Sequence, residues 1–121
     1  MKSPILNYVV EGSGPPVFLL HGLAASRYDW QMLAPIIARM GFSVYSVDLF
    51  GHGDSPRPDD PQCYHANYVL QTLLDWVESL ELTLHATLIG HSLGGYLSIK
   101  LVGLNPEWFH SLVLINPFIS L

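Results

Sequence analysis

The stretch LHATLIGHSLGGYLSIKLVGL, residues 84–104, decides the predicted fold. It opens with a short apolar run, Leu84–Ile89, which predicts a buried strand. It closes with Leu93–Leu104, where leucines recur at a helical spacing. Between them, Gly90-His91-Ser92-Leu93-Gly94 fits the pattern G-x-S-x-G. A serine on a sharp turn between a strand and a helix is a nucleophile elbow, so Ser92 is the candidate nucleophile.

Glycines surround Ser92 for a steric reason. The serine must occupy a tight, strained turn, and small residues at positions 90 and 94 avoid clashes there, with Gly95 adding a third. The turn lifts the Ser92 hydroxyl above the sheet. The following helix points its N-terminal N–H groups at the same place, where negative charge would develop in a reaction. The alternative is a glycine-rich turn in which the serine is incidental.

A second loop supplies the other half of the candidate site. His21-Gly22-Leu23-Ala24-Ala25 follows the predicted strand Val17–Leu20. An oxyanion hole needs one N–H from the residue after the nucleophile and one from the loop after this strand, which nominates Leu93 and Leu23. The alternative is an ordinary strand–helix turn. The expected supporting residues are His21, Gly22, Gly90, His91, Gly94, Gly95 and Asp48.

Strands and helices alternate along the chain. The predicted strands are Ile5–Val10, Val17–Leu20, Ser43–Val47, Leu84–Ile89 and Ser111–Ile115, and the predicted helices are Asp29–Met40, Asn67–Leu80 and Leu93–Leu104. Pro35 lies inside the first helical window and predicts a kink or a late start there. The alternation predicts an α/β fold, with a mainly parallel sheet and helices on both faces.

Composition limits the class of protein. The chain has 121 residues and a formal net charge of −5; half of it is apolar and 12% is charged. The length predicts about one domain, residues 1–121, and the apolar fraction excludes disorder. The five Lys and Arg residues are scattered, which argues against a nucleic-acid partner.

Further classes are excluded by residue types and spacing. Cys63 is the only cysteine, so a disulfide scaffold is excluded. No apolar run reaches about 18 residues, so no membrane span is expected. No cluster of His, Asp or Glu has the spacing of metal ligands. We therefore expect a reduced, cytoplasmic protein with neither metal nor cofactor.

Three landmarks, taken together, resemble the α/β-hydrolase superfamily in the branch that bears a cap domain. They are His21-Gly22, the run Asp48-Leu49-Phe50-Gly51-His52-Gly53-Asp54-Ser55, and the elbow Gly90–Gly95. The middle run resembles a D-x-x-G-x-G-x-S loop, which implies that Asp48, Gly51, Gly53 and Ser55 shape the floor beside the active site. The resemblance implies a serine hydrolase that acts on a small ester or related acyl substrate.

The serine also separates subfamilies. The resemblance implies an aspartate nucleophile in haloalkane dehalogenases and epoxide hydrolases, so Ser92 disfavours both. Carboxylesterases, lipases, carbon–carbon bond hydrolases, thioesterases, proline iminopeptidases and cofactor-free haloperoxidases remain open.

The resemblance also implies a triad whose acid and histidine follow later strands, beyond the cap. The sequence stops at Leu121, just after Ser111–Ile115, and Ile5–Val10 matches the second strand of the family. We therefore expect the N-terminal portion of an α/β-hydrolase domain, truncated after Ser111–Ile115.

Residues within the chain offer weak substitutes for the absent base. His21, His52 and His91 are candidates near the elbow, and Asp48 is interpreted as a turn-stabilising carboxylate. Asn116 follows the last strand, where some family members carry the acid, but an amide cannot ionise. The remaining histidines are expected at the surface: His65, His85 and His110.

Two other functions stay open. The chain is alternatively a non-catalytic binding module, or an inactive truncated remnant. In either case Ser111–Ile115 is expected at the edge of the sheet, where an apolar strand favours self-association or pairing with a complementary chain.

Overall fold

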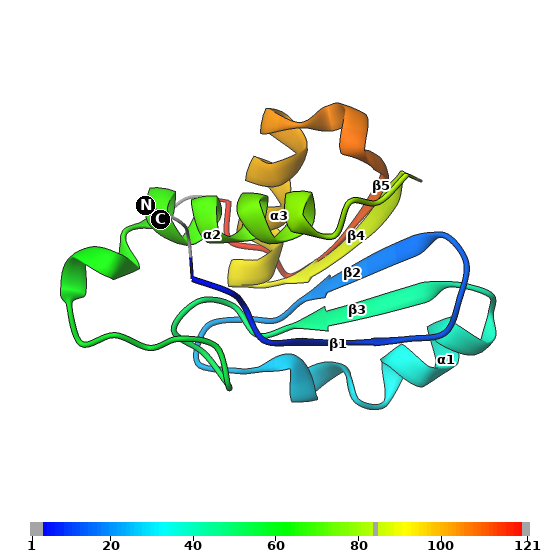
Figure 1. Ribbon diagram of the computed structural model, residues 1–121, viewed down its shortest axis with the longest axis horizontal. Coiled ribbons are helices and arrows are strands. Elements are labelled where there is room, and N and C mark those ends of the chain that lie inside the picture. Colours follow the sequence, from blue (N-terminus) through cyan, green and yellow to red (C-terminus); the bar gives the residue numbers. More distant parts are fainter. Residues whose placement is uncertain (1–3, 84, 120–121) are drawn as a thin grey trace.

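A five-stranded mixed sheet forms the middle layer of the fold, in the order β1-β3-β2-β4-β5 (Figure 1). The computed structural model describes residues 4–83 and 85–119. β1 pairs antiparallel with β3, and the other three pairings are parallel. The strands are β1 (Tyr8–Glu11), β2 (Pro16–Leu20), β3 (Ser43–Val47), β4 (Ala86–His91) and β5 (Phe109–Ile115).

Helices cover both faces of this sheet, which confirms the predicted architecture. α1 (Leu33–Arg39) lies on one face, whereas α2 (Ala66–Ser79) and α3 (Leu93–Leu104) lie on the other (Figure 1). The sheet is mainly parallel, as predicted, with β1 as its antiparallel member.

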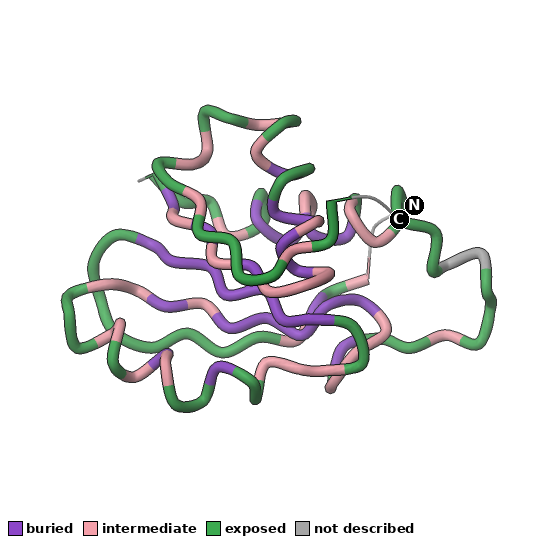
Figure 2. The backbone as a smooth tube through the Cα atoms, turned by 180° about the vertical axis from the view of Figure 1, so that it is seen from behind, coloured by how far each residue is buried: buried purple, intermediate pink, exposed green. Residues whose placement is uncertain are grey.

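β2 is the centre of the core because helices cover it from both sides. All five of its residues are buried, and the buried segments concentrate in the central strands (Figure 2). Successive side chains of a strand point to opposite faces. Accordingly, Phe18 and Leu20 pack on the α2–α3 side, and Val17 and Leu19 pack on the α1 side.

The structure differs from the sequence prediction in the bounds of several elements. The predicted helix Asp29–Met40 is divided into a 3-10 turn, Arg27–Trp30, and a helix that starts late, at Leu33. Pro35 then falls in the first turn of α1, where its missing N–H costs no helical hydrogen bond. The predicted strand Leu84–Ile89 becomes Ala86–His91, and Leu84 itself lies outside the described residues.

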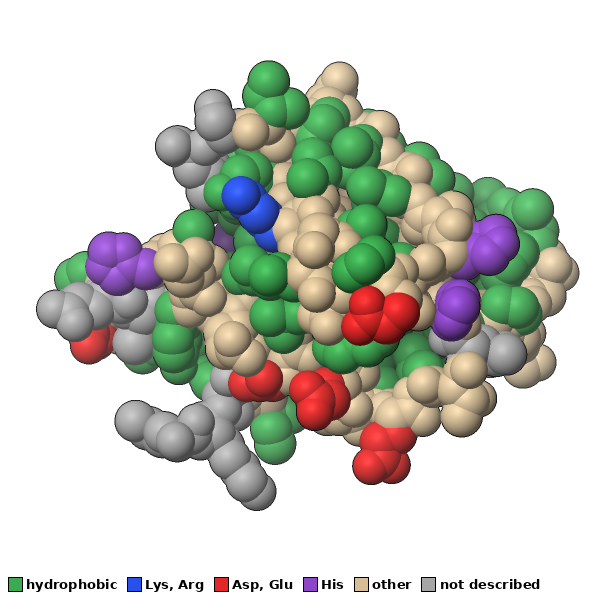
Figure 3. Space-filling model, turned by 90° about the horizontal axis from the view of Figure 1, so that it is seen from above, with side chains coloured by type: hydrophobic (Ala, Val, Ile, Leu, Met, Phe, Trp, Pro, Cys, Tyr) green, Lys and Arg blue, Asp and Glu red, His purple; other side chains and the backbone are tan. Residues whose placement is uncertain are grey.

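Exposed apolar side chains occur on several elements, β5 among them. β5 lies at one end of the described sheet, as expected, and its last three residues, Val113, Leu114 and Ile115, are exposed. Hydrophobic side chains spread over the face above α2 and α3 (Figure 3). Within residues 4–83 and 85–119, no helix has the length and hydropathy needed to cross a bilayer.

Candidate active site

Ser92 stands between β4 and α3 in a strained backbone conformation. Its φ is +55° and its ψ is −115°, a region that costs a non-glycine residue about 1–3 kcal/mol. Three backbone hydrogen bonds of 3.1 Å hold it there. The Ser92 N–H donates to the carbonyl of Ile115, and the Ser92 carbonyl accepts from the N–H groups of Tyr96 and Phe118. The end of β5 therefore fixes the turn that carries the serine.

Gly90 and Gly94, beside Ser92, lie where a side chain would collide with neighbouring atoms. A Cβ on Gly94 would overlap the carbonyl oxygen of Leu20, at the end of β2. A Cβ on Gly90 would lie 2.6 Å from the hydroxyl oxygen of Ser98. These contacts agree with the steric reason that the sequence suggested, since a side chain at either position would push the turn away from the sheet.

The loop after β2 passes directly against the serine. A Cβ built on Gly22 would lie 3.2 Å from the Cβ of Ser92 and 3.2 Å from Nδ1 of His91. The next residue is Leu23, whose N–H has no hydrogen-bond acceptor among the described residues. The N–H of Leu93 belongs to the first turn of α3, where helical geometry provides no acceptor. Neither N–H is therefore committed to an acceptor in the described part of the chain.

Both ring nitrogens of His21 hydrogen-bond within the loops, so His21 is not placed to serve as a base. It is fully buried; its Nδ1 lies 2.7 Å from the carbonyl oxygen of Gly22, and its Nε2 accepts the N–H of Leu49 at 3.0 Å. Burial lowers the pKa of His21 below its ordinary value; the bond to Gly22 opposes this and nearby His52 adds to it. The ring is therefore neutral, with its proton on Nδ1.

Both ring nitrogens of His52 also have hydrogen-bond partners in the loops. Its Nε2 accepts the N–H of Ala24 at 3.0 Å, and its Nδ1 lies 3.0 Å from the carbonyl oxygen of Phe50. Its ring lies 5.0 Å from that of His21, centroid to centroid. Neither nitrogen is free to take a proton from Ser92.

Asp48 hydrogen-bonds to three separate segments of the chain. Its carboxylate accepts the N–H of Arg27 at 2.8 Å, the N–H of Asp54 at 3.0 Å and the side-chain amide of Asn7 at 2.9 Å. Burial alone would raise the pKa of Asp48. These bonds and the Arg27 guanidinium, 3.5 Å away, outweigh burial and hold the pKa below its ordinary value. The contacts agree with a turn-stabilising role, and Asn7 and Arg27 are partners that the sequence reasoning missed.

No base for Ser92 is present in the described part of the chain. No side chain there hydrogen-bonds to the Ser92 hydroxyl, although His91 is its neighbour. The histidines expected at the surface are exposed: His65, His85 and His110. Within the same residues, no group of His, Cys, Asp or Glu could hold a metal ion.

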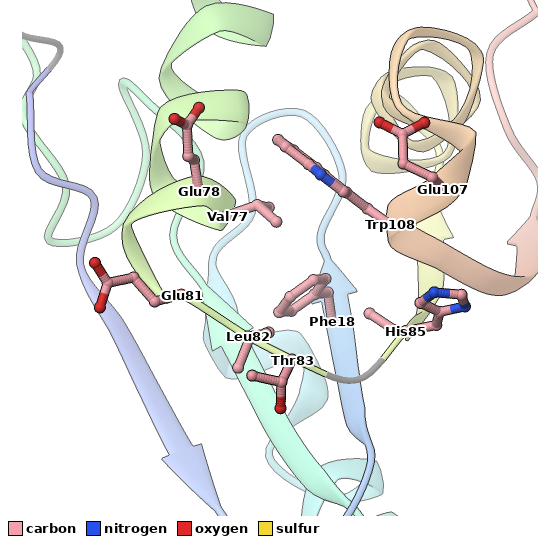
Figure 4. Close-up of a pocket in the computed structure, with 10 residues that line it drawn as sticks. Phe18, Val77, Glu78, Glu81, Leu82, Thr83, His85, Glu107 and Trp108 are labelled. Atoms are coloured by element: carbon pink, nitrogen blue, oxygen red, sulfur yellow. The ribbon is translucent and has the colours of Figure 1, made fainter.

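A cavity of about 320 Å³ lies at the opposite edge of the sheet, where β4 and β5 begin (Figure 4). Phe18 and Trp108 line it together with three carboxylates, those of Glu78, Glu81 and Glu107. None of the candidate site residues borders it, so it is separate from the surface around Ser92.

The buried neutral state of His21 predicts a pH-dependent stability. Between its lowered folded pKa and its ordinary value near 6.5, the unfolded chain binds a proton that the folded chain does not. We therefore expect the free energy of unfolding to fall as the pH is lowered below about 6.5. Urea unfolding between about pH 5 and pH 7 measures this slope.

The matched variant is His21→Gln, whose amide oxygen can still accept the Leu49 N–H but does not titrate. It should lose the slope, whereas His110→Gln, which removes an exposed histidine, should retain it. An unchanged slope in His21→Gln would show that other groups cause the acid destabilisation.

Together, the mixed sheet, the covering helices and the strained serine define a class of α/β proteins. In this class a turn between a strand and a helix presents one side chain above the carboxyl edge of the sheet. Residues 15–121 match the family described as the alpha/beta hydrolase fold. The chain belongs to the α/β-hydrolase family.

Similar proteins carry several hydrolase names. The chain is 33% identical over 114 residues to "Bifunctional epoxide hydrolase 2" of Sus scrofa, a match that covers 93% of this chain and 20% of that protein. It superimposes on the solved "Marine microorganism esterase" with a TM-score of 0.83 and 30% identity, covering 93% of this chain and 41% of the other. The solved "Epoxide hydrolase CorEH" gives 0.85 and 29%, covering 96% and 40%. The chain thus spans between a fifth and two fifths of these relatives.

Proposed function

We propose that this chain carries the nucleophile and the oxyanion hole of a serine hydrolase for small ester or related acyl substrates. The observation that carries the proposal is the strained Ser92, with its φ of +55°, placed against the Gly22 loop. Strain of this kind persists where the surrounding structure enforces it, and it is concentrated at active sites. The family assignment adds that similar proteins bear the names of hydrolases.

The proposed chemistry assigns a role to each group. The Ser92 hydroxyl oxygen attacks the substrate carbonyl carbon and forms a bond to it, while the hydroxyl proton passes to a base. The carbonyl oxygen becomes an oxyanion, which the N–H groups of Leu23 and Leu93 stabilise. The leaving group departs with a proton, and water then releases the acyl group from Ser92. We assign the base and its acid to residues outside 4–83 and 85–119, because His21 and His52 are engaged in the loops and no other described histidine hydrogen-bonds to the Ser92 hydroxyl.

The serine supports acyl chemistry over the epoxide and haloalkane chemistry of other family branches. The resemblance assigns an aspartate to the nucleophile of those branches, and this chain has Ser92 in that place. The proposed cytoplasmic location rests on composition alone, with Cys63 as the only cysteine.

Covalent labelling with a fluorophosphonate probe tests the proposal. In the natural protein that carries these residues, we expect labelling that Ser92→Ala abolishes, because the probe reacts only with an activated serine. Ser13→Ala, which alters an exposed serine in the turn between β1 and β2, is the matched control and should label normally. If the folded protein is not labelled, or if Ser92→Ala still is, the proposed function is wrong.

A second candidate function is a binding module that pairs through β5. The observation in its favour is the exposed apolar end of that strand, at Val113, Leu114 and Ile115. Light scattering across a concentration series separates the two candidates. A protein that associates through β5 and is not labelled at Ser92 would support the module, and a labelled monomer would exclude it.

A further inference from the structure

Two histidine side chains link the loops that follow β2 and β3, and each accepts a backbone N–H from the other loop. His21, in the first loop, accepts the N–H of Leu49 in the second. His52, in the second loop, accepts the N–H of Ala24 in the first. Each acceptor distance is 3.0 Å, and the two rings lie against each other. We call this reciprocal pair the histidine clasp.

The clasp requires one tautomer of each ring. An Nε2 that accepts an N–H carries no proton, so the proton lies on Nδ1. Each Nδ1 faces a carbonyl oxygen of its own loop, that of Gly22 for His21 and that of Phe50 for His52. The four bonds are therefore mutually consistent only when both rings are neutral.

The clasp holds a strained turn. The Ala25 N–H donates to the carbonyl of Gly22 at 3.3 Å, which places Leu23 and Ala24 at the centre of a tight turn. Ala24 has a φ of +60°, a conformation that favours glycine. Its N–H is the one that His52 accepts, so the clasp stabilises the turn at its least favourable residue.

We propose that His52 is a positioning residue that, through the Ala24 N–H, fixes the turn presenting the Leu23 N–H to the oxyanion. This inference rests on the proposed function, because it gives the turn a role at Ser92. Gly22 lies against both Ser92 and His91, so a displaced turn moves the donor relative to the nucleophile. An oxyanion donor must lie within hydrogen-bond distance of the developing charge, and small displacements weaken it.

Two substitutions at His52 separate the clasp from general packing. His52→Leu retains apolar bulk and removes the acceptor for Ala24. His52→Gln retains an acceptor, because its amide oxygen stands as many bonds from Cα as Nε2 does. His110→Leu, which removes an exposed histidine from β5, is the control.

The test measures two quantities in each folded variant. Hydrogen exchange at the Ala24 amide reports on the clasp and needs no catalysis. We expect His52→Leu to accelerate it by about fivefold to tenfold, the effect of losing one net hydrogen bond. The fluorophosphonate labelling rate of Ser92 reports on the oxyanion hole. We expect His52→Leu to slow it by about tenfold to a hundredfold, and His52→Gln to restore most of both values.

The outcomes distinguish this inference from the proposed function. If Ser92 labels at the same rate in His52→Leu as in the wild type, the positioning role is wrong while the proposed function stands. If exchange at Ala24 is unchanged in His52→Leu, the clasp itself is wrong. If the wild type does not label, the proposed function and the positioning role fall together. A loss of labelling that His52→Gln does not restore would point to packing and would also overturn the inference.

Discussion

Gly94→Ala is expected to lower the free energy of unfolding by about 3 kcal/mol and to abolish labelling at Ser92. The added methyl would occupy the space of the Leu20 carbonyl oxygen. A flexible side chain could move aside, but this oxygen belongs to a buried strand that pairs on both sides. The start of α3 would therefore move away from β2, and the turn at Ser92 would move with it.

Gly103 provides a control within the same helix. Apart from its chain neighbours and the backbone of its own helix, no atom lies within 4 Å of the position that its Cβ would take. Gly103→Ala should therefore raise the free energy of unfolding by about 0.5 kcal/mol, because alanine is the better helix former. Urea unfolding followed by circular dichroism measures both variants. If Gly94→Ala were as stable as the wild type, the close approach of α3 to β2 would be wrong.

Asp48→Asn is expected to destabilise the fold by about 3 kcal/mol despite its similar shape. One carboxylate oxygen accepts the N–H of Asp54 and the side-chain amide of Asn7. The other accepts the N–H of Arg27. An asparagine can offer an oxygen to one side only, so its NH₂ group would face donors on the other. Those donors would lose their acceptor, and the Arg27 guanidinium would lose the nearer of its two carboxylate partners.

The same carboxylate predicts an acid-dependent loss of stability. Its pKa is held below the ordinary value, so the unfolded chain binds a proton that the folded chain excludes. This contribution is complete above about pH 4 and is lost as the pH falls through the folded pKa. Asp48→Asn should lack it.

Asp54→Asn is the matched control for this carboxylate. Its side chain is 69% exposed and lies 3.7 Å from the Arg27 guanidinium, an arrangement that contributes little. Unfolding by guanidinium chloride from pH 7 to about pH 2 compares the variants. If Asp48→Asn and Asp54→Asn lowered the free energy of unfolding equally, Asp48 would stabilise the fold only through its charge.

Local sequence patterns were sufficient to predict β3 and α3. The predicted strand Ser43–Val47 and helix Leu93–Leu104 agree with the structure residue for residue. In both, the residues that end the element are adjacent to it in sequence: Asp48 follows β3, and Asn105-Pro106 follows α3.

The predictions that failed depended on distant residues. The strand predicted from Ile5 begins only at Tyr8. Asn7 instead donates its backbone N–H to the Ser55 hydroxyl, 48 residues away, and its side chain binds Asp48. The histidine clasp escaped prediction for the same reason, since 28 residues separate each ring from the N–H that it accepts. The assignments of Ser92, Leu23 and Leu93 to catalysis stay predictions.

The bonds that join Ser92 to Ile115 and Phe118 can form only after the rest of the turn has been synthesised. A ribosome releases the polypeptide N-terminus first, so the glycine turn emerges well before residues 115–118. Until then, the acceptor on Ile115 and the donor on Phe118 do not yet exist for Ser92. A nascent chain that ends before Ile115 therefore lacks two of the three backbone hydrogen bonds that hold Ser92. The full set of bonds at this turn is completed only late in translation.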